Sequence, residues 1–207
     1  MARPRSAGFE LQREQMLAAA AQLFATRGYT AATMQDLASA CGVSKATLYH
    51  YVRDKQELLL QITQGHVQRL EAVVNDVVSA EPDPHRRLSA LVLRFMQVYA
   101  SAQHEHRVLT EDVKFLDLLE RDEVLACQRR VVQAFADSMG ALRPDLQRQA
   151  LHVPLAMLLF GMMNWTFTWL RPGGALTHES LAPVVLQLLL GGLPAVRAPL
   201  AEVSLPG

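Results

Sequence analysis

The sequence predicts an all-α protein in which a three-helix domain precedes a larger helical bundle. Apolar residues recur at helical spacing through most of the 207-residue chain. Several of these stretches follow a hydroxyl or acidic residue of the kind that caps helices. No stretch alternates apolar and polar residues for long enough to predict a strand. Half of the residues are hydrophobic, so a chain of this length has enough apolar surface to bury a core.

The first predicted helix covers residues 10–27, where Leu17, Ala21 and Phe24 recur on one face. Gly28 directly follows this helix. Glycine readily takes the left-handed backbone conformation that ends many helices. The chain is therefore expected to turn at Gly28.

Two shorter helices follow, joined by a tight turn. Thr33, with an acid three residues later, forms a capping-box pattern that begins a helix over 34–40. Gly42 allows the chain to turn, and Ser44 is suited to cap a helix over 45–52. Two short helices joined by a glycine-containing turn are the sequence form of a helix-turn-helix. The first domain is therefore predicted to be a three-helix helix-turn-helix domain.

The rest of the chain is predicted to form a bundle of helices separated by breaks that contain proline or glycine. These helices are expected over residues 55–80, 85–103, 106–118, 121–141, 145–170 and 179–191. Pro154 is expected to kink or interrupt the fifth of them. The predicted domains are 1–55, 56–193 and a loose tail, 194–207.

Positive charge is concentrated at the start of the chain. Residues 1–55 carry 7 Lys or Arg and 4 Asp or Glu, a net charge of +3, whereas the remaining residues carry −3. A basic first domain favours an anionic partner, although chance scatter is the other explanation. The apolar runs fall short of the roughly 18 residues that a membrane-spanning helix needs, and the polar N-terminus lacks a signal-peptide pattern. A cytoplasmic protein without a membrane partner is expected.

Catalytic and metal-binding patterns are not found in the sequence. His104 and His106 invite a metal interpretation, but side chains two positions apart do not share a helix face. No glycine-rich nucleotide-binding motif or nucleophile-elbow motif occurs. We therefore expect no enzyme activity, no metal site and no cofactor.

The helix predicted from residue 45 carries a set of groups suited to nucleic acid. Lys45, Ala46 and Tyr49 share one face of it, while Leu48 points toward the first helix. The DNA major groove admits an α-helix, where Lys45 can reach a guanine edge and the other two can meet a thymine methyl group. Phosphate contacts are expected from Lys55 and from nearby hydroxyl groups, namely those of Thr33, Ser44 and Thr47. The alternative is that all of these are ordinary solvated residues on a helical bundle.

Residues 10–60 resemble the N-terminal domain of TetR-family transcriptional regulators. The residues that carry the resemblance are Gly28-Tyr29, Thr33, Leu37-Ala38, Gly42-Val43-Ser44, Thr47-Leu48-Tyr49, Lys55 and Glu57-Leu58. The resemblance implies base contacts from Gln35, Lys45, Ala46 and Tyr49. It implies phosphate contacts from Thr33, Ser44, Thr47, Lys55 and either His50 or Tyr51. The choice between the last two is open, because the family often has His then Phe after two aromatic residues and this chain has His50-Tyr51-Val52.

Two later stretches, LTEDVKFL at 109–116 and GMMNWTFTWLRPGG at 161–174, resemble the TetR branch that responds to fatty-acyl- or aryl-acyl-CoA thioesters. This resemblance implies a hydrophobic effector held in an apolar pocket between helices. The predicted lining residues are Met96, Tyr99, Phe115, Phe160, Met162, Met163, Trp165 and Trp169, for which plain core is the alternative. Asp112 and Asn164 are expected to hydrogen-bond the effector or to be satisfied core groups. The cations expected to meet a CoA phosphate are Arg94, Lys114 and Arg171.

The helices predicted over 145–170 and 179–191 have too few polar residues to keep one face in water. Family members pair such helices across a two-fold axis, which implies a dimerisation bundle and a palindromic operator. We therefore expect a ligand-responsive transcriptional repressor that binds double-stranded DNA as a homodimer and is released by a hydrophobic effector, with acyl-CoA thioesters as the candidate class. The alternatives are a constitutive DNA-binding regulator without a ligand, and a helical lipid-binding protein or enzyme.

Overall fold

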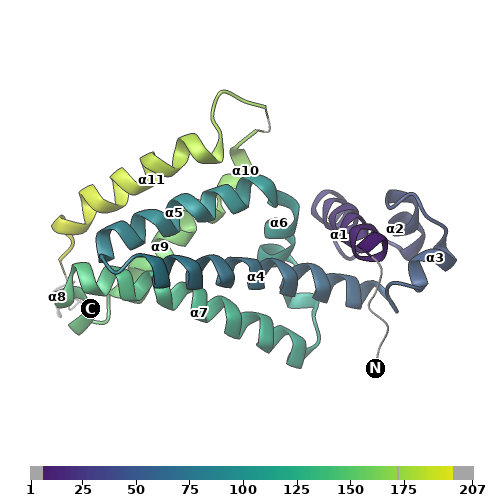
Figure 1. Cartoon of the computed structure of the whole chain (residues 1–207), viewed down its shortest axis with the longest axis horizontal. Helices are drawn as coiled ribbons and strands as arrows, with labels where there is room; N and C mark the ends of the chain where they lie inside the picture. Colours follow the sequence, from purple (N-terminus) through teal and green to yellow (C-terminus); the bar gives the residue numbers. More distant parts are fainter. Residues whose placement is uncertain (1–6, 172, 198–207) are drawn as a thin grey trace, which may run out of the picture. The chain divides into compact units, whose positions relative to one another are not determined.

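Helices form all the regular elements of the part of the chain that the structure describes. The structure is a computed structural model in which residues 7–171 and 173–197 are described. Figure 1 shows the helices coloured from the start of the chain to its end. Their bounds are α1 Ala7–Arg27, α2 Met34–Ala40, α3 Lys45–Tyr49, α4 Lys55–Ala80, α5 Pro84–Ser101, α6 Gln103–Glu111, the 3-10 helix η1 Val113–Phe115, α7 Leu118–Leu142, α8 Pro144–Arg148, α9 His152–Asn164, α10 Thr166–Trp169, α11 His178–Gly192 and the 3-10 helix η2 Leu193–Ala195. The all-α prediction is confirmed.

The chain divides into two compact units. Unit 1 contains the chain up to Leu70 together with Ser101–Gln128, and unit 2 contains Glu71–Ala100 together with the chain from Arg129 onward. Helices α4 and α7 each begin in unit 1 and end in unit 2. The domain boundaries predicted after residues 55 and 193 stay predictions, because these units divide the chain by contacts and not by function.

Side chains cap both short helices of the helix-turn-helix, as the sequence predicts. The Thr33 hydroxyl accepts a hydrogen bond of 3.1 Å from the Asp36 amide, and the Asp36 carboxylate accepts one of 3.0 Å from the Thr33 amide. The Ser44 hydroxyl accepts a bond of 3.0 Å from the amide of Thr47. A hydroxyl cap of this kind stabilises a helix by about 1 kcal/mol. The caps therefore fix where two helices of only 7 and 5 residues begin.

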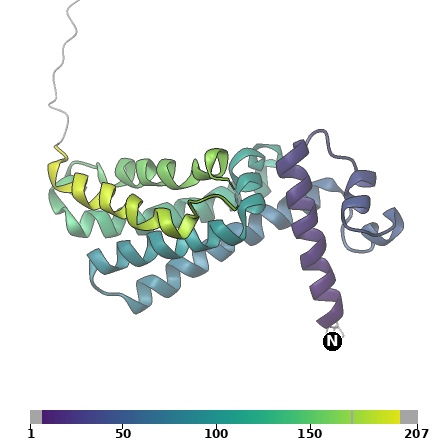
Figure 2. The same ribbon diagram turned by 90° about the horizontal axis from the view of Figure 1, so that it is seen from above.

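Two glycines and a small apolar core complete this part of unit 1. Gly28 and Gly42 have φ angles of 86° and 66°, in the left-handed region that the predicted turns require. Phe24 is buried and its ring meets that of Tyr29 edge to face, with centroids 5.2 Å apart. Leu48 of α3 is fully buried. Figures 1 and 2 show α1, α2 and α3 grouped together, and this small core is what holds them.

Two helices predicted in unit 1 are shorter in the structure. Helix α3 ends at Tyr49 and not at residue 52, because the chain turns there and buries Val52. The helix predicted over 106–118 is replaced by α6 and η1, which meet at Asp112. This second turn brings Leu116 into the core, where it is 5% exposed.

The helical segment predicted over 145–170 is interrupted, as expected, but not at Pro154: α8, α9 and α10 occupy it. The chain breaks at Ala150, which has a φ of 57°. The amide of Leu151 donates to the carbonyl of Leu146, and the amide of Ala150 donates to that of Gln147, which is the usual left-handed ending of a helix. Pro154 lies in the first turn of α9, where the missing amide hydrogen is not needed.

Aromatic rings fill the core of unit 2. Phe135 lies between Phe95 and Phe160, with ring centroids 4.9 and 4.8 Å away, and all three side chains are buried. Aromatic pairs at these separations contribute about 0.5–1.5 kcal/mol beyond their burial. Helices α9 and α11 are neighbours at the end of the chain (Figures 1 and 2).

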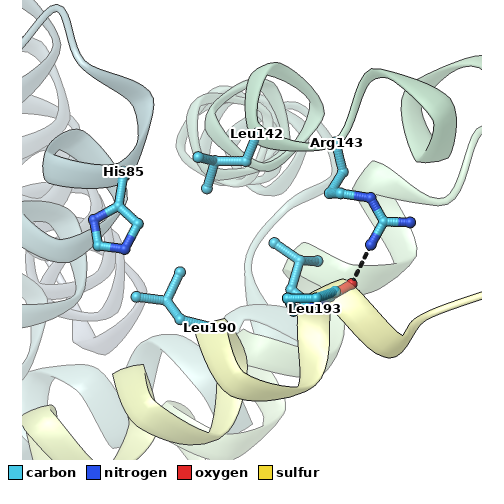
Figure 3. A pocket seen from close by; sticks show the side chains of 6 residues that line it. His85, Leu142, Arg143, Leu190 and Leu193 are labelled. Atoms are coloured by element: carbon cyan, nitrogen blue, oxygen red, sulfur yellow. Dashed lines mark hydrogen bonds between the residues drawn. The ribbon is translucent and has the colours of Figure 1, made fainter.

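Arg143 anchors the end of helix α11. Its guanidinium donates to the carbonyl of Leu193, as Figure 3 shows beside a small pocket that His85 also lines. It also pairs with the Asp145 carboxylate at 2.9 and 2.8 Å, which holds the pKa of that carboxyl at about 2. The guanidinium is therefore used to fix α8 and the end of α11. Most of the tail predicted over 194–207 lies outside the described residues.

Candidate functional site

The residues proposed to read DNA bases lie on the exposed surface of unit 1. Lys45, Ala46 and Tyr49 are exposed on α3, and Gln35 is exposed on α2. The Lys45 ammonium lies 6.0 Å from the centre of the Tyr49 ring, so a cation and a ring share one short helical face. Leu48 points the other way into the core, as the sequence predicts. The base contacts themselves stay predictions.

Three hydroxyl groups near this face already make hydrogen bonds, and two of them, Thr33 and Ser44, cap helices. The Ser44 and Thr47 hydroxyl oxygens lie 2.8 Å apart. The Thr33 hydroxyl donates to the Asp36 carboxylate at 2.7 Å, and that carboxylate also pairs with Arg27 at 2.9 Å. These bonds hold the pKa of Asp36 below its usual range, with the Thr33 hydroxyl as the largest cause. A phosphate at Thr33 would therefore meet a carboxylate, whereas Ser44 and Thr47 keep an exposed edge at the start of α3.

The structure separates His50 from Tyr51, the pair that the sequence leaves open. The Tyr51 hydroxyl donates to the Gln12 amide oxygen at 2.6 Å, and its ring stacks on that of Phe9 with centroids 4.6 Å apart. Tyr51 therefore ties α3 to α1. His50 follows α3 directly and its side chain is exposed, which favours His50 as the phosphate contact.

Lys55 is engaged within unit 1, although the sequence predicts a phosphate contact. Its ammonium donates to the carbonyls of Tyr29 at 2.8 Å, Ala32 at 3.0 Å and Thr30 at 3.4 Å. The ammonium also lies 4.4 Å from the centre of the Tyr29 ring. An ammonium group has three N–H donors, so these carbonyls account for all of them. The phosphate contact stays a prediction, and the geometry favours a role in joining the α1–α2 turn to α4.

Arg53 is a cation that the sequence interpretation missed. It lies between α3 and α4, its side chain is 80% exposed, and it pairs with Glu57 at 3.2 Å. An exposed surface pair of this kind contributes little to stability. Arg53 is therefore an additional candidate for contact with phosphate, and its place between two capped helices is the signal that marks it.

The residues predicted to line one effector pocket have three different environments. Met96, Tyr99 and Phe160 are buried in unit 2, where they belong to the packed core. The Tyr99 hydroxyl donates to the amide oxygen of the half-buried Asn164 at 2.8 Å, and an effector contact from Asn164 stays a prediction. Burial also raises the pKa of Tyr99. These three buried side chains fill the interior of unit 2.

Asp112 and Phe115 belong to unit 1, and the other predicted pocket residues belong to unit 2. Asp112 is 8% exposed, and burial raises the pKa of its carboxyl, with Glu111 adding to the effect. The Phe115 ring stacks on Tyr29, with centroids 5.3 Å apart. Within unit 1 these two residues therefore lie beside the helix-turn-helix and not in the aromatic core.

The third environment is an open apolar groove on unit 2, which we call the α9–α11 groove. It has a volume of about 590 Å³ and is bordered by α9, α10 and α11. Its exposed apolar lining includes Met157, Leu158, Met162, Trp165, Val184 and Leu188. Trp165 is 65% exposed and Trp169, which also lines the groove, is 49% exposed. The two tryptophans and Met162 thus face outward, and apolar residues gathered in this way mark a site of association.

The cations predicted for a CoA phosphate are dispersed. Arg94 pairs with Asp76 at 3.2 Å in unit 2, and the Lys114 ammonium lies 5.2 Å from the Phe115 ring in unit 1. Arg171 is exposed after α10. Within residues 7–171 and 173–197, no three His, Cys, Asp or Glu side chains are grouped to hold a metal ion. No helix in these ranges has the length and apolar character to cross a bilayer.

Family models match most of the chain. Residues 16–62 match the model of bacterial regulatory proteins, tetR family, and residues 81–193 match the model of the tetracyclin repressor-like C-terminal domain. The chain is 29% identical to the HTH-type transcriptional repressor KstR2 of Mycobacterium tuberculosis (strain ATCC 25618 / H37Rv), over 88% of this chain and 92% of that protein. It is 32% identical to the HTH-type transcriptional activator FasR of Mycolicibacterium smegmatis, over 89% of this chain and 84% of that protein.

Solved structures give the same similarity in three dimensions. A TetR-family transcriptional regulator from Bordetella parapertussis 12822 is 31% identical, with a TM-score of 0.83 over 90% of this chain and 98% of that one. AibR, solved in complex with isovaleryl coenzyme A and operator DNA, is 25% identical, with a TM-score of 0.73 over 86% of this chain and 97% of that one.

Proposed function

The chain belongs to the TetR family of bacterial regulatory proteins, and on that premise we propose that it is a homodimeric repressor of a palindromic operator, released by an acyl-CoA thioester. Its relatives are transcriptional regulators and not enzymes. A cytoplasmic location is part of this proposal. The observation that carries it is the exposed face of α3, which presents Lys45 and Tyr49 from a capped helix-turn-helix.

Operator binding is supported by the chemistry of the α3 face. Leu48 is the buried residue of this helix, and its other side is free for a major groove. Lys45 is proposed to read a guanine edge, and Ala46 and Tyr49 a thymine methyl group. Ser44, His50 and Arg53 are proposed to bind the flanking phosphates.

Dimer formation is supported by the α9–α11 groove. A surface of this size, lined by methionine, leucine, valine and tryptophan, is costly to leave in water. A second copy offers the same surface, and pairing across a two-fold axis would cover both. That symmetry would also give two α3 helices related in the same way as the half-sites of a palindrome.

The choice of effector is supported by one relative. AibR has been solved with isovaleryl coenzyme A and operator DNA together. We propose a thioester of the same class here, bound by unit 2 in a conformation that opens its core. Ligand and operator would then compete through different affinities for two arrangements of the helices.

A constitutive regulator without a ligand is the second candidate function. It is favoured by the packed core around Phe135, where the predicted pocket residues Met96, Tyr99 and Phe160 are buried. FasR is named as an activator, so membership of the family does not decide between repression and activation. Repression is therefore part of the proposal.

Fluorescence anisotropy with a symmetric duplex selected from a randomised library tests the proposal. Lys45→Ala and Tyr49→Ala should each weaken specific binding by about tenfold, since a good base contact is worth about 1–3 kcal/mol. Arg86→Ala, which removes an exposed cation from α5, is the matched control and should change nothing. If the wild-type chain binds every symmetric duplex no better than a scrambled one, the repressor proposal is wrong.

A second titration tests the effector. Isovaleryl-CoA and longer acyl-CoA thioesters are added to the preformed complex of protein and duplex, with free CoA as the control. Release by a thioester but not by free CoA supports the ligand-responsive repressor. Unchanged operator affinity with every thioester supports the constitutive regulator.

A further inference from the structure

Four side chains of unit 1 form a closed set of contacts beside the helix-turn-helix. We call this set the Tyr29 cluster, and its members are Tyr29, Lys55, Gln56 and Phe115. Tyr29 lies in the turn between α1 and α2, Lys55 and Gln56 begin α4, and Phe115 ends η1. The cluster thus joins three segments that are far apart in the sequence.

The contacts connect each member to the next. The Phe115 ring stacks on the Tyr29 ring with an interplanar angle of 23°. The Tyr29 hydroxyl donates to the Gln56 amide oxygen at 2.8 Å, and burial raises the pKa of Tyr29, which keeps this hydroxyl a donor. The Gln56 amide nitrogen in turn donates to the Phe115 carbonyl at 2.8 Å. Only one orientation of the amide satisfies both bonds.

Lys55 extends the cluster to the backbone of the helix-turn-helix. Its ammonium lies over Tyr29 and donates to the carbonyls of Tyr29 and Ala32. Ala32 directly precedes Thr33, which caps α2. A displacement of Phe115 would therefore move the ring that supports the ammonium, and with it the turn from which α2 begins.

The chain on either side of Phe115 gives this contact its importance. Helix α6 ends just before η1, and α7 begins just after it. Further along, α7 carries Phe135, which lies at the centre of the aromatic core of unit 2. Along the chain, α7 therefore begins directly after η1 and carries a residue of that core.

We propose that Phe115 is a positioning residue for operator binding, which fixes the orientation of the helix-turn-helix on the start of α4 through Tyr29 and Gln56. The inference rests on the proposed function, because the orientation of the helix-turn-helix matters only if two copies of it must bind two half-sites together. Two helix-turn-helix domains held in a fixed orientation bind half-sites at one separation, whereas domains free to reorient bind half-sites at several separations.

The test measures binding to a series of symmetric duplexes whose half-sites are moved apart or together by single base pairs. Phe115→Ala should weaken binding at the preferred separation by about tenfold, the order of one aromatic contact. It should also flatten the preference among separations, while binding to a random duplex of equal length, which depends on phosphate contacts, stays within about twofold of wild type. Leu119→Ala, at a position 81% exposed on α7, is the matched control and should leave the profile unchanged.

Gln56→Glu repeats the test with a side chain of the same size. A carboxylate cannot donate to the Phe115 carbonyl, so this variant opens the cluster while keeping every ring. A profile flattened as in Phe115→Ala supports the inference. A wild-type profile in both variants overturns it, and so does an equal loss of specific and random binding, because that loss indicates damage to the fold. If the wild-type protein has no operator preference at all, the repressor proposal fails first.

Discussion

Unit 1 and unit 2 each keep a surface exposed that their cores do not need, and the chemistry of the two surfaces is opposite. The α3 face of unit 1 presents a lysine, a phenol ring and capping hydroxyls. The α9–α11 groove of unit 2 presents methionine, leucine and tryptophan. Phosphates and base edges suit the first surface, and another apolar protein surface suits the second. The difference shows that exposure alone does not indicate a function, and that side-chain chemistry narrows the kind of partner each surface suits.

The largest expected effect comes from placing charge in the groove. Leu158→Glu with Leu188→Glu should convert the proposed dimer to a monomer, because burying unpaired carboxylates costs several kcal/mol. Light scattering coupled to size-exclusion chromatography measures the mass of the protein in solution. Operator binding should weaken as the measured mass falls to that of a monomer. The control is Leu119→Glu on unit 1. A dimer that survives both substitutions would show that another surface pairs the protomers.

Acid should affect unit 1 through His66, whose ring nitrogen lies 3.2 Å from that of His106. Burial, and then the charge of Arg69, lowers the pKa of His66 to about 4. Above the ordinary histidine pKa near 6.5, His66 is neutral in both the folded and the unfolded chain, so it makes no pH-dependent contribution to stability. Below that value the unfolded chain takes up a proton that the folded chain does not. The free energy of unfolding should therefore fall by about 3 kcal/mol between pH 6.5 and pH 4.

Urea denaturation across this pH range measures the free energy of unfolding, and His66→Gln should make that free energy depend less steeply on pH. His178 of unit 2 also has a pKa lowered by burial, so His178→Gln serves as the comparison between the units. A slope that responds to His178→Gln and not to His66→Gln would contradict the assignment to unit 1.

A smaller loss should follow from Lys55→Ala. Hydrogen bonds from a charged donor contribute about 1.5–3 kcal/mol, so losing the contacts to Tyr29 and Ala32 should lower the free energy of unfolding by about 2 kcal/mol. Chemical denaturation measures this change. If stability is unchanged and binding to specific and random duplexes weakens equally, then Lys55 is a phosphate contact and belongs to the α3 surface after all.

The smallest expected effect is a gain at Ala150. Its φ of 57° is unfavourable for alanine and ordinary for glycine. Ala150→Gly should therefore raise the free energy of unfolding by about 0.5 kcal/mol, the left-handed strain being partly offset by the greater freedom of glycine when unfolded. Thermal unfolding detects it, with Ala141→Gly at an exposed position within α7 as the control that should destabilise.

Local signals in the sequence predict the helix-turn-helix well. Thr33, Ser44 and Gly42 act on residues within three or four positions, so their effect can be read without knowing the fold. The break at Ala150 has no such signal, because alanine favours helix and the left-handed turn is imposed by the packing of Leu146 and its neighbours. Pro154 suggested the wrong place for the break, since proline is tolerated in a first turn.

The site residues show the same limit. The outward direction of Lys45 and Tyr49 follows from helical spacing once the helix start is known. Hydrophobicity does not distinguish an interior from an interface, so Trp165 and Phe160 were predicted for one pocket and lie in different environments. The bonds of Lys55 join residues 23 to 26 positions apart, and no local pattern in the sequence encodes them.

The residues that hold α3 in place are different from those proposed to read DNA. Leu48 and the Ser44 cap hold the helix, while positions 45, 46 and 49 contribute nothing to the core. A library randomised at those three positions should yield variants that remain folded yet prefer new target sequences. Descendants of one gene could acquire different regulons by the same route, without first having to recover lost stability.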